Sequence, residues 1–340
     1  MLAAPEFSLA YTPQVRERTE HLYARLSART TRAEWELFAP YIARIGELKA
    51  ERNAIVLAHH YQASEIYASV ADVVGDSLAL AQSAAATEAD AIVMCGVHFM
   101  AETAKLLNPG RTVLLPDLAA GCSLAESIGP EDVRRLRTQH PGAPVVTYVN
   151  TSAAVKAESD ICCTSANAVR VVESLGAPKV IFLPDEYLGA YVAAHTAVEI
   201  VTWRGHCEVH ERFTAEQIAE LRSGTPGIVV LAHPECPPEV LAAADVVGST
   251  STMLAYVRDH RPPKVAMITE CAMAGNVALA FPDIEFVQPC NLCPHMRRIT
   301  LPKILRALET MAPQIEIEPA VAERARRAVE RMTAIGRDAA

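Results

Sequence analysis

Three cysteines recur at a near-constant interval, and this repeat restricts the fold more than any other feature of the chain. The interval from Cys122 to Cys207 is 85 residues, and the interval from Cys207 to Cys293 is 86. Each cysteine follows a short apolar run, at residues 112–115, 199–203 and 284–287. Equal spacing with equal surroundings indicates a triplicated unit in which each copy supplies one thiol.

Two further landmarks repeat in the same order without involving these cysteines. A short apolar run that reads as a buried strand precedes a pair of polar residues two positions apart, and these pairs are His59 with Tyr61, Tyr148 with Asn150, and His233 with Glu235. An aspartate then precedes a hydroxyl residue by five positions, as in Asp72 with Ser77, Asp160 with Ser165, and Asp245 with Thr250. Three landmarks at nearly one interval make a coincidence improbable, so we treat the triplication as a property of the fold.

The apolar runs predict four strands in each unit, separated by helical stretches. They lie at residues 55–58, 70–74, 91–95 and 112–115, then 145–149, 161–163, 179–183 and 199–203, then 228–232, 246–247, 264–268 and 284–287. This alternation is typical of an α/β fold with parallel sheets and helices on the sheet faces. We expect the three units at residues 51–122, 123–207 and 208–293. A helical extension is expected at residues 1–50, with helices at 11–30 and 32–49. A helical tail at residues 294–340, interrupted by Pro302, Pro313 and Pro319, should pack on the first unit.

Composition narrows the class of partner. Hydrophobic residues make up 51% and charged residues 21%, as in an ordinary globular protein. No apolar stretch approaches the roughly 20 residues that cross a bilayer, and residues 1–10 lack the pattern of a secretory signal, so we expect a cytoplasmic protein. The net charge of −9 argues against nucleic acid or an anionic membrane as the main partner. Nine cysteines without a signal sequence predict reduced thiols for metal binding or catalysis rather than a disulfide framework.

The repeated motifs suggest a binding site for a small anion. Ligands of parallel α/β sheets bind at the carboxyl ends of the strands, where each polar pair lies, and residues two apart on a strand point the same way. Gly75 and Gly248 then suit a tight turn, and the hydroxyls that follow fall where helices would start, a position that binds carboxylate or phosphate. These hydroxyls are Ser77, Ser165, Ser249 and Thr250. For a single copy, an ordinary turn or a simple helix cap would explain each motif better, but three copies favour a shared site.

If the three repeated cysteines converge, they would bind a metal. Zinc and an iron–sulfur cube with one iron free of protein ligands both remain open. We assign the third ligand to Cys293 rather than Cys290, which is redox-active or an incidental neighbour, because only Cys293 keeps the spacing. The remaining cysteines lie in apolar or strand contexts and are expected to be small buried thiols: Cys95, Cys162, Cys163, Cys236 and Cys271. The sequence lacks the glycine-rich nucleotide motifs and the His-Glu-x-x-His zinc motif, which removes most support for nucleotide hydrolysis and dinucleotide redox chemistry.

Taken together, the short motifs resemble the quinolinate synthase family over about residues 45–332. They are Ala58-His-His-Tyr-Gln62, Gly75-Asp-Ser77, Phe99-Met-Ala-Glu102 with Leu107-Asn-Pro109, Tyr148-Val-Asn150, Cys163-Thr-Ser-Ala-Asn167, Gly205-His-Cys207 with Val209-His210, His233-Pro-Glu-Cys236 and Val247-Gly-Ser-Thr250. Many motifs in one order make this resemblance specific.

The resemblance implies three pseudo-equivalent αβα three-layer domains around a central site, and an enzyme of NAD biosynthesis. Such an enzyme condenses iminoaspartate with dihydroxyacetone phosphate into quinolinate, phosphate and two waters. It also implies a four-iron four-sulfur cluster on Cys122, Cys207 and Cys293. The residues implied to bind substrate are His59, Ser77, Tyr148, Asn150, Ser165, His210, His233, Glu235, Ser249 and Thr250. Those implied to act in proton transfer are Tyr61, Glu235 and His233. An aspartate oxidase is a possible upstream supplier of the imine.

Some features depart from the family pattern or leave alternatives. Glu208 stands where proline is expected after Cys207, and Thr269-Glu-Cys-Ala-Met273 replaces a Thr-Glu-x-Gly pattern, which leaves the role of Glu270 open. A disulfide between Cys290 and Cys293 is conceivable. We expect desolvation to raise the pKa of Glu235 toward neutrality, where a general acid or base works best. The competing hypotheses are a radical enzyme of the diphthamide-synthesis type and a zinc-holding or metal-free binding module.

Overall fold

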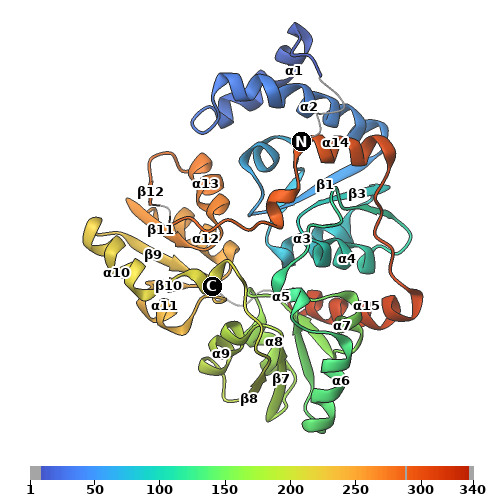
Figure 1. Cartoon of the computed structure of the whole chain (residues 1–340), viewed down its shortest axis with the longest axis vertical. Coiled ribbons are helices and arrows are strands. Elements are labelled where there is room, and N and C mark those ends of the chain that lie inside the picture. Colours follow the sequence, from blue (N-terminus) through green and yellow to red (C-terminus); the bar gives the residue numbers. More distant parts are fainter. Residues whose placement is uncertain (1–8, 288, 337–340) are drawn as a thin grey trace, which may run out of the picture.

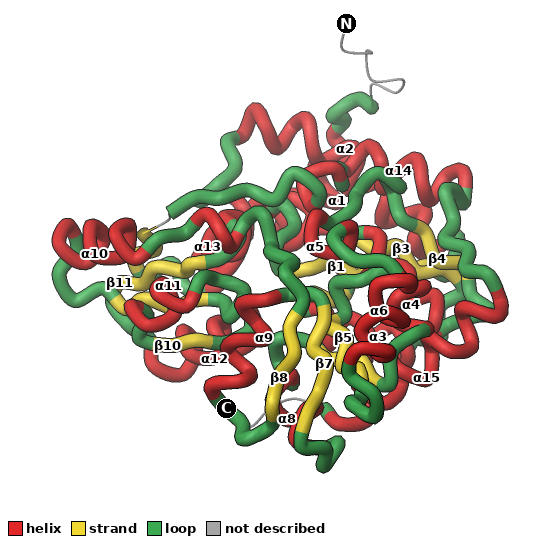
Figure 2. Tube along the Cα trace, turned by 60° about the horizontal axis from the view of Figure 1, so that its bottom comes forward, coloured by secondary structure: helices red, strands yellow, loops and turns green. Residues whose placement is uncertain are grey.

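The computed structural model describes residues 9–287 and 289–336, and this part contains three parallel sheets of four strands each (Figure 1). The strand orders are β2-β1-β3-β4, β6-β5-β7-β8 and β10-β9-β11-β12, so each sheet repeats the order second, first, third, fourth. Figure 2 shows the three groups of strands with helices around them. The predicted α/β class and the triplication are therefore confirmed. Residues 1–8 of the predicted extension and residues 337–340 of the predicted tail lie outside the described part.

The first strand of the first unit is mostly buried, and the unit ends in the loop of Cys122. Its elements are β1 (Ala54–His59), η1 (Ile66–Val70), β2 (Val73–Gly75), α3 (Ser77–Ala86), β3 (Ala91–Cys95), α4 (His98–Leu107), β4 (Thr112–Leu114) and α5 (Ser123–Glu126). The central strand β3 is buried along its whole length, as expected of a parallel sheet covered on both faces. The second strand begins at Val73 rather than at residue 70 as predicted, because the helical turn η1 occupies the preceding residues.

The second unit repeats this arrangement at the bottom of Figure 1. Its elements are α6 (Pro130–Gln139), β5 (Val145–Tyr148), α7 (Ala153–Ala157), β6 (Ile161–Cys163), α8 (Ala168–Ser174), β7 (Lys179–Leu183), α9 (Glu186–Ala194) and β8 (Glu199–Thr202).

The third unit lies on the left of Figure 1. It comprises η2 (His210–Arg212), α10 (Ala215–Gly224), β9 (Val229–Ala232), α11 (Pro238–Ala243), β10 (Val246–Val247), α12 (Thr250–His260), β11 (Lys264–Ile268), α13 (Cys271–Ala280), β12 (Glu285–Val287) and η3 (Met296–Arg298). We propose that each sheet with its helices is one domain; α5 and η3 lie just past the predicted boundaries at residues 122 and 293.

Helices lie near both ends of the described part of the chain. The extension forms α1 (Pro13–Leu26) and α2 (Arg32–Glu51), the second of which starts at a capping box between Thr31 and Glu34. The tail forms α14 (Leu301–Thr310) and α15 (Pro319–Ile335). Helix α14 packs on α2, whereas α15 contacts α4 of the first unit and α7 and β6 of the second. The tail therefore ties the first two units together.

The repeated aspartates have a structural function that is the same in each unit. A carboxylate oxygen of Asp72, Asp160 and Asp245 accepts the backbone N–H of Val56, Val145 and Val230, at 2.7 to 2.8 Å. Each aspartate also pairs with a cation, which is Lys49, Arg137 and Arg222 in turn. The aspartate thus fixes the start of the second strand against the first strand of its sheet.

The glycines of the same motif explain where the next helix begins. A Cβ at Gly75 would lie 2.8 Å from the Cβ of Ala79, and a Cβ at Gly248 would lie 2.6 Å from the side chain of Thr252. Glycine therefore permits the following helix to start at once, at Ser77 and at Thr250. In the second unit Cys163 occupies this position, and helix α8 begins only at Ala168.

Candidate active site

A cavity of about 730 Å³, counting the open space at its mouth, is lined by residues of all three units. The carboxyl ends of the first strands lead into it, because His59 ends β1, Tyr148 ends β5 and His233 directly follows β9. Parallel sheets of identical strand order deliver these side chains in equivalent ways, which is why the sequence could pair them.

Nearly all the residues expected at the site line this cavity. They are His59, Tyr61, Ser77, Cys122, Tyr148, Asn150, Ser165, Cys207, His210, His233, Glu235, Thr250 and Cys293. Ser249 is not among the lining residues. Its hydroxyl accepts the N–H of Thr252 and caps helix α12. A simple helix cap was the other explanation that the sequence left for this motif.

A turn closed by the same backbone hydrogen bond follows each of the three cysteines. The carbonyl oxygen of Cys122 accepts the N–H of Glu126, that of Cys207 accepts the N–H of Glu211, and that of Cys293 accepts the N–H of Arg297. The hydrogen bond spans four residues in every copy. The repeat therefore extends to the backbone hydrogen bond that follows each candidate ligand.

Contacts between these loops hold them beside one another. The N–H of Glu208 donates to the Ser123 hydroxyl at 3.4 Å, and the Glu208 carboxylate lies 3.1 Å from Nε2 of His295. Glu208, the residue found where proline was expected, therefore contacts the loops of Cys122 and Cys293 from the loop of Cys207.

Two buried acidic residues, Asp185 and Glu270, support the loops of Cys207 and Cys293. Asp185 and Glu270 follow the third strand of their sheets and cap helices α9 and α13. Asp185 forms a backbone bridge with Gly205, and Glu270 forms one with Asn291, so each bridge lies two residues before a cysteine. One carboxylate oxygen of Glu270 also accepts the N–H of Cys293 at 3.3 Å. Glu270, whose role the sequence left open, thus anchors the third cysteine loop and lines the cavity.

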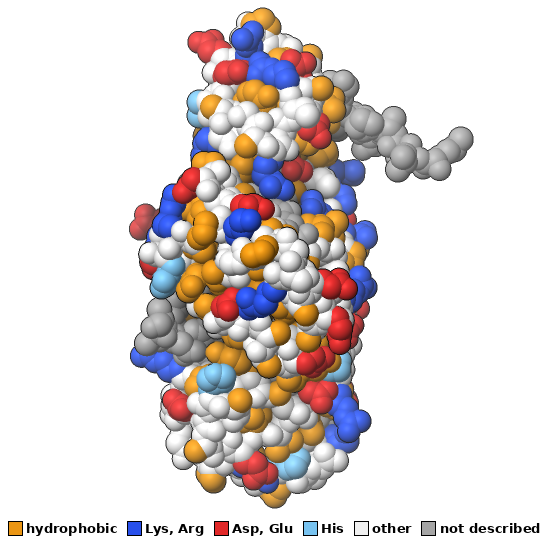
Figure 3. Space-filling model, turned by 90° about the vertical axis from the view of Figure 1, so that its left-hand side faces the viewer, with side chains coloured by type: hydrophobic (Ala, Val, Ile, Leu, Met, Phe, Trp, Pro, Cys, Tyr) orange, Lys and Arg blue, Asp and Glu red, His pale blue; other side chains and the backbone are white. Residues whose placement is uncertain are grey.

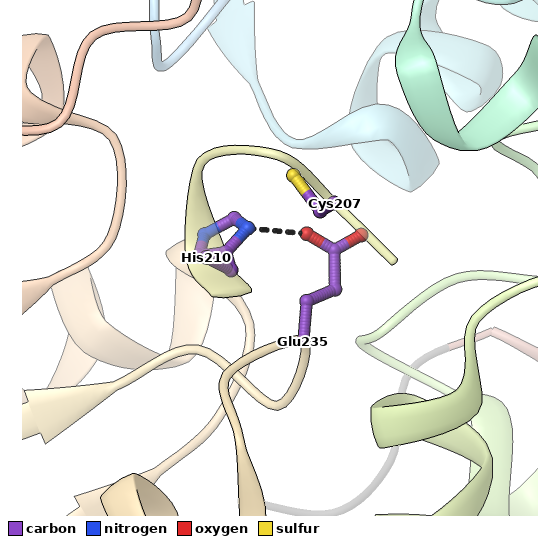
Figure 4. Close-up of side chains that lie close together, drawn as sticks. All are labelled: Cys207, His210 and Glu235. Atoms are coloured by element: carbon purple, nitrogen blue, oxygen red, sulfur yellow. Dashed lines mark ion pairs between the residues drawn. The ribbon is translucent and has the colours of Figure 1, made fainter. Parts of the chain in front are cut away.

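The thiols lie in surroundings that keep them protonated unless a cation is bound. Burial raises the pKa of Cys122 to about 12 and that of Cys293 to about 11, and it raises the pKa of Cys207 well above the ordinary value of a thiol. A metal centre offsets this desolvation, because it binds the thiolate form directly. The Cys207 sulfur, a His210 nitrogen and a Glu235 oxygen also lie within 4.8 Å of one another (Figure 4).

A chain of polar contacts crosses the cavity wall between the first and third units. The Tyr61 hydroxyl lies 2.6 Å from the Thr269 hydroxyl, which lies 2.9 Å from Nε2 of His210. Nδ1 of His210 lies 2.7 Å from Oε2 of Glu235, an ion-pair contact that is short but poorly aligned for a hydrogen bond (Figure 4). The contact chain therefore joins two expected acid/base residues through Thr269, which the sequence analysis did not select. The only signal for Thr269 was its place at the end of strand β11.

The charges around Glu235 correct one expectation. Burial alone would raise the pKa of Glu235, but its interactions with His210 and His233 outweigh burial and lower the pKa to about 2. The carboxyl group is therefore ionised at neutral pH, and the expected rise toward neutrality is wrong. The reason is that sequence indicates burial but not which neighbours face a buried group.

Four other titratable groups of the site are neutral. Burial lowers the pKa of His59 and of His233 to about 3, so both imidazoles are uncharged at pH 7. Burial, reinforced by the Glu235 charge, raises the pKa of Tyr61 and of Tyr148 well above the ordinary range, so both phenols keep their protons. The ionised Glu235 carboxylate therefore faces neutral imidazole and phenol groups.

Several polar side chains of the cavity are held in place by hydrogen bonds to neighbouring residues. Nδ2 of Asn150 donates to Glu235 at 3.3 Å, while the buried Oδ1 of Asn150 has no hydrogen-bond partner within residues 9–287 and 289–336. Nε2 of His233 lies 3.2 Å from the Ser165 hydroxyl. The Thr250 hydroxyl lies 2.9 Å from Nδ1 of His60. An unpartnered amide oxygen beside these groups indicates a site built for a polar ligand.

Known proteins resemble the chain over almost all of its length. Residues 43–334 match the family model described as quinolinate synthetase A protein. The chain belongs to the quinolinate synthase family. Relatives named quinolinate synthase include one from Agrobacterium fabrum, 62% identical over 92% of this chain and 91% of the relative, and one from Caulobacter vibrioides, 52% identical over 97% and 91%. Quinolinate synthase 2 of Mesorhizobium japonicum is 62% identical over 92% of this chain and 97% of the relative.

Quinolinate synthases are enzymes of NAD biosynthesis and depend on an iron–sulfur centre, and the donor set found here fits such a group. Three thiols on equivalent loops line one cavity, and the high pKa values of the free thiols reflect buried groups that a cluster would deprotonate. Family membership also removes the binding-module hypothesis and the radical-enzyme hypothesis.

One cysteine expectation fails. Cys271 was expected to be a small buried thiol, but it forms a disulfide with Cys290. Cys293 remains free, so Cys290 does not pair with it. The N–H of Cys271 donates to the carbonyl oxygen of Asn291. This contact places Cys290, which precedes Asn291, beside the start of helix α13. Sequence distance gives no hint of this pairing, because the two cysteines meet only when the third sheet forms.

The surface is unexceptional on the face shown in Figure 3, where acidic and basic side chains are interspersed rather than gathered into a stripe of one sign. Among the described residues, no helix has the length and apolar character needed to span a bilayer.

Proposed function

We propose that this chain condenses iminoaspartate with dihydroxyacetone phosphate to form quinolinate, phosphate and two waters. The observation that carries the proposal is the convergence of three equivalent cysteine loops and three polar strand ends on one cavity, in a member of this family. The atoms balance without an oxidant or reductant. The protein must therefore bind two anions, move protons and assist the departure of phosphate and water.

We propose that Cys122, Cys207 and Cys293 hold a four-iron four-sulfur cluster. When bound through three thiolates, the cluster would supply one iron that is open to a substrate oxygen and acts as a Lewis acid. Ligand atoms of Cys207, His210 and Glu235, which lie within 4.8 Å of one another, form the alternative site for a single metal ion. Metal and sulfide analysis separates these two cases.

The remaining residues would bind the substrates as neutral hydrogen-bond partners. Helix α3 starts at Ser77 and helix α12 starts at Thr250, and both of these hydroxyl residues line the cavity. Helix starts favour carboxylate and phosphate groups. His59, Tyr148, Asn150, Ser165 and His233 would add donors around them. Substrate anions could then bind in a protein of net negative charge without a lysine in the lining.

Proton transfer to and from the substrates would use the two ends of the contact chain, Tyr61 and Glu235. With a proton on Nδ1 of His210 facing the carboxylate, Nε2 accepts the Thr269 proton, and the Thr269 oxygen accepts the Tyr61 proton. Glu235, which is ionised, would take a proton from a substrate, and Tyr61, which keeps its proton, would donate one, so the two ends act as base and acid in enolisation and dehydration. With its hydrogen bonds reversed, the chain would then return the proton from Glu235 to Tyr61. His233, 3.4 Å from Glu235, would orient the carboxylate.

An anaerobic assay tests the function directly. Protein purified without oxygen should contain about four irons and four sulfides, and it should form quinolinate from iminoaspartate and dihydroxyacetone phosphate. A colourless protein that binds zinc, or a cluster-loaded protein that forms no quinolinate, would refute the proposal.

We also propose that the imine comes from an aspartate oxidase in the cytoplasm. An imine hydrolyses in water, so an enzyme that forms it must act shortly before this one. Addition of an aspartate oxidase with aspartate and an electron acceptor other than oxygen should support quinolinate formation in the same anaerobic assay.

A further inference from the structure

A buried asparagine in helix α13 lies opposite the turn that carries Tyr61. Asn276 is 2% exposed, and the other buried residues of α13 are Ala272, Met273, Ala274, Gly275 and Val277. Asparagine is a poor helix former and gains little from burial in apolar surroundings. Its presence in this apolar face therefore points to a specific polar contact.

The Asn276 amide makes three hydrogen bonds to that turn, two as donor and one as acceptor. Its Nδ2 group donates to the carbonyl oxygen of His60 at 3.0 Å and to that of Gln62 at 2.8 Å. Its Oδ1 accepts the Ser64 hydroxyl at 2.8 Å. The two carbonyl groups flank Tyr61 on either side in the chain, so the amide fixes the backbone on both sides of this residue.

The same segment of the third unit also holds the other end of Tyr61. Thr269, which contacts the Tyr61 hydroxyl at 2.6 Å, lies two residues before helix α13 begins. The backbone and the hydroxyl of Tyr61 are thus both held by residues 269–276. A shift of the turn relative to α13 would move the hydroxyl away from Thr269 and interrupt the contact chain.

We infer that Asn276 is a positioning residue that fixes the turn at residues 60–64 so that the Tyr61 hydroxyl meets Thr269. This inference rests on the proposed role of Tyr61 in the reaction. Asn276 itself does not line the cavity, so it acts through Tyr61 and not on the substrate.

The test replaces Asn276 with leucine, which has a similar shape but cannot form hydrogen bonds. A misplacement of about 1 Å at a reacting group can lower a rate about 100-fold, so we expect kcat of Asn276→Leu to fall about 10- to 100-fold. The affinity for quinolinate and the iron content should stay near those of the unaltered protein. Asn108→Leu is the matched control, because Asn108 is also buried and donates to two carbonyl oxygens, of Ala84 and Ala104, away from the cavity.

Two measurements distinguish positioning from a general loss of stability. In the Tyr61→Phe background, Asn276→Leu should change the rate less than about 3-fold, because residues that act through one another are not additive. Hydrogen exchange of the peptide that covers residues 59–67 should speed up in Asn276→Leu and not in Asn108→Leu, and this readout remains if Tyr61→Phe has no measurable rate.

Several outcomes would overturn the inference. These are an unchanged kcat in Asn276→Leu, an equal loss in Asn108→Leu, an equal loss in both Tyr61 backgrounds, or unchanged exchange at residues 59–67. Failure of the unaltered, cluster-loaded protein to form quinolinate would instead refute the proposed function. Full activity of Tyr61→Phe would refute the role of Tyr61.

Discussion

Replacing Thr269 with valine tests the contact chain with the smallest change of shape. Thr269 is fully buried, and its hydroxyl contacts both the Tyr61 hydroxyl and Nε2 of His210. Valine fills nearly the same volume but has no hydroxyl. The substitution therefore removes the central member of the chain and leaves the two residues beside it in place.

The expected magnitude follows from what each neighbour loses. The Tyr61 hydroxyl and Nε2 of His210 would each lose a partner, and a buried polar group without a partner costs about 1–3 kcal/mol. We therefore expect the free energy of unfolding to fall by about 2–4 kcal/mol, with some of this loss recovered by local adjustment. General acid–base catalysis contributes about 10²- to 10⁴-fold to a rate, so kcat should fall within that range.

The assay is steady-state quinolinate formation under anaerobic conditions, with iron content and quinolinate affinity measured on the same samples. Thr269→Ser is the control, since serine keeps the hydroxyl, and its kcat should stay within about 10-fold of the unaltered protein. If Thr269→Val kept more than a third of the original kcat, Thr269 would not transmit a proton. If Thr269→Ser lost as much as Thr269→Val, packing at this position would explain the effect instead.

Four more predictions test other parts of the site. Cys207→Ala should lose the cluster, because two thiolates do not retain it in water; full iron content would remove Cys207 from the ligands. Glu235→Gln should keep the cluster and bind quinolinate but turn over at least about 100-fold more slowly, and near-normal turnover would exclude Glu235 as an acid or base. The pKa of His233 is about 3 in the folded state against 6.5 for an ordinary histidine. As the pH falls below 6.5, the unfolded chain therefore takes up a proton at this residue and the folded protein does not. The free energy of unfolding thus has its full value above pH 6.5 and decreases below it. His233→Gln should lower the slope of unfolding free energy against pH between 5 and 6 by up to about 1.4 kcal/mol per pH unit, and an unchanged slope would contradict the neutral state. Cys271→Ser should destabilise the fold by up to about 3 kcal/mol, because the disulfide to Cys290 closes a loop of 19 residues, and a stability equal to that of the unaltered protein under oxidising conditions would contradict this linkage.

Much of the fold could be predicted from the sequence because the same pattern of residues occurs in three copies. A single apolar run or polar pair is ambiguous, but His59, Tyr148 and His233 occupy the same place in three copies, and each copy supports the interpretation of the others. The three aspartates behave in the same way, since each accepts the N–H of a residue in the first strand of its sheet. The start of helix α8 differed from its counterparts for a local reason, because Cys163 replaces a glycine.

The residues that sequence could not select are those defined by contacts between units. Thr269 and Asn276 form no repeat and have ordinary neighbours in the chain, yet both contact the segment around Tyr61, more than 200 residues earlier. The pKa of Glu235 likewise depends on His210 and His233 facing it across a buried space.

The sequence by itself indicated the α/β class, the threefold repeat and the equal spacing of three cysteines, because each follows from local patterns of apolar and polar residues. The tertiary structure alone decided the disulfide of Cys271, the placement of Thr269 and Asn276 against Tyr61, and the charge of Glu235. These properties arise where separate units meet, and no local pattern records which side chains then lie within hydrogen-bonding distance.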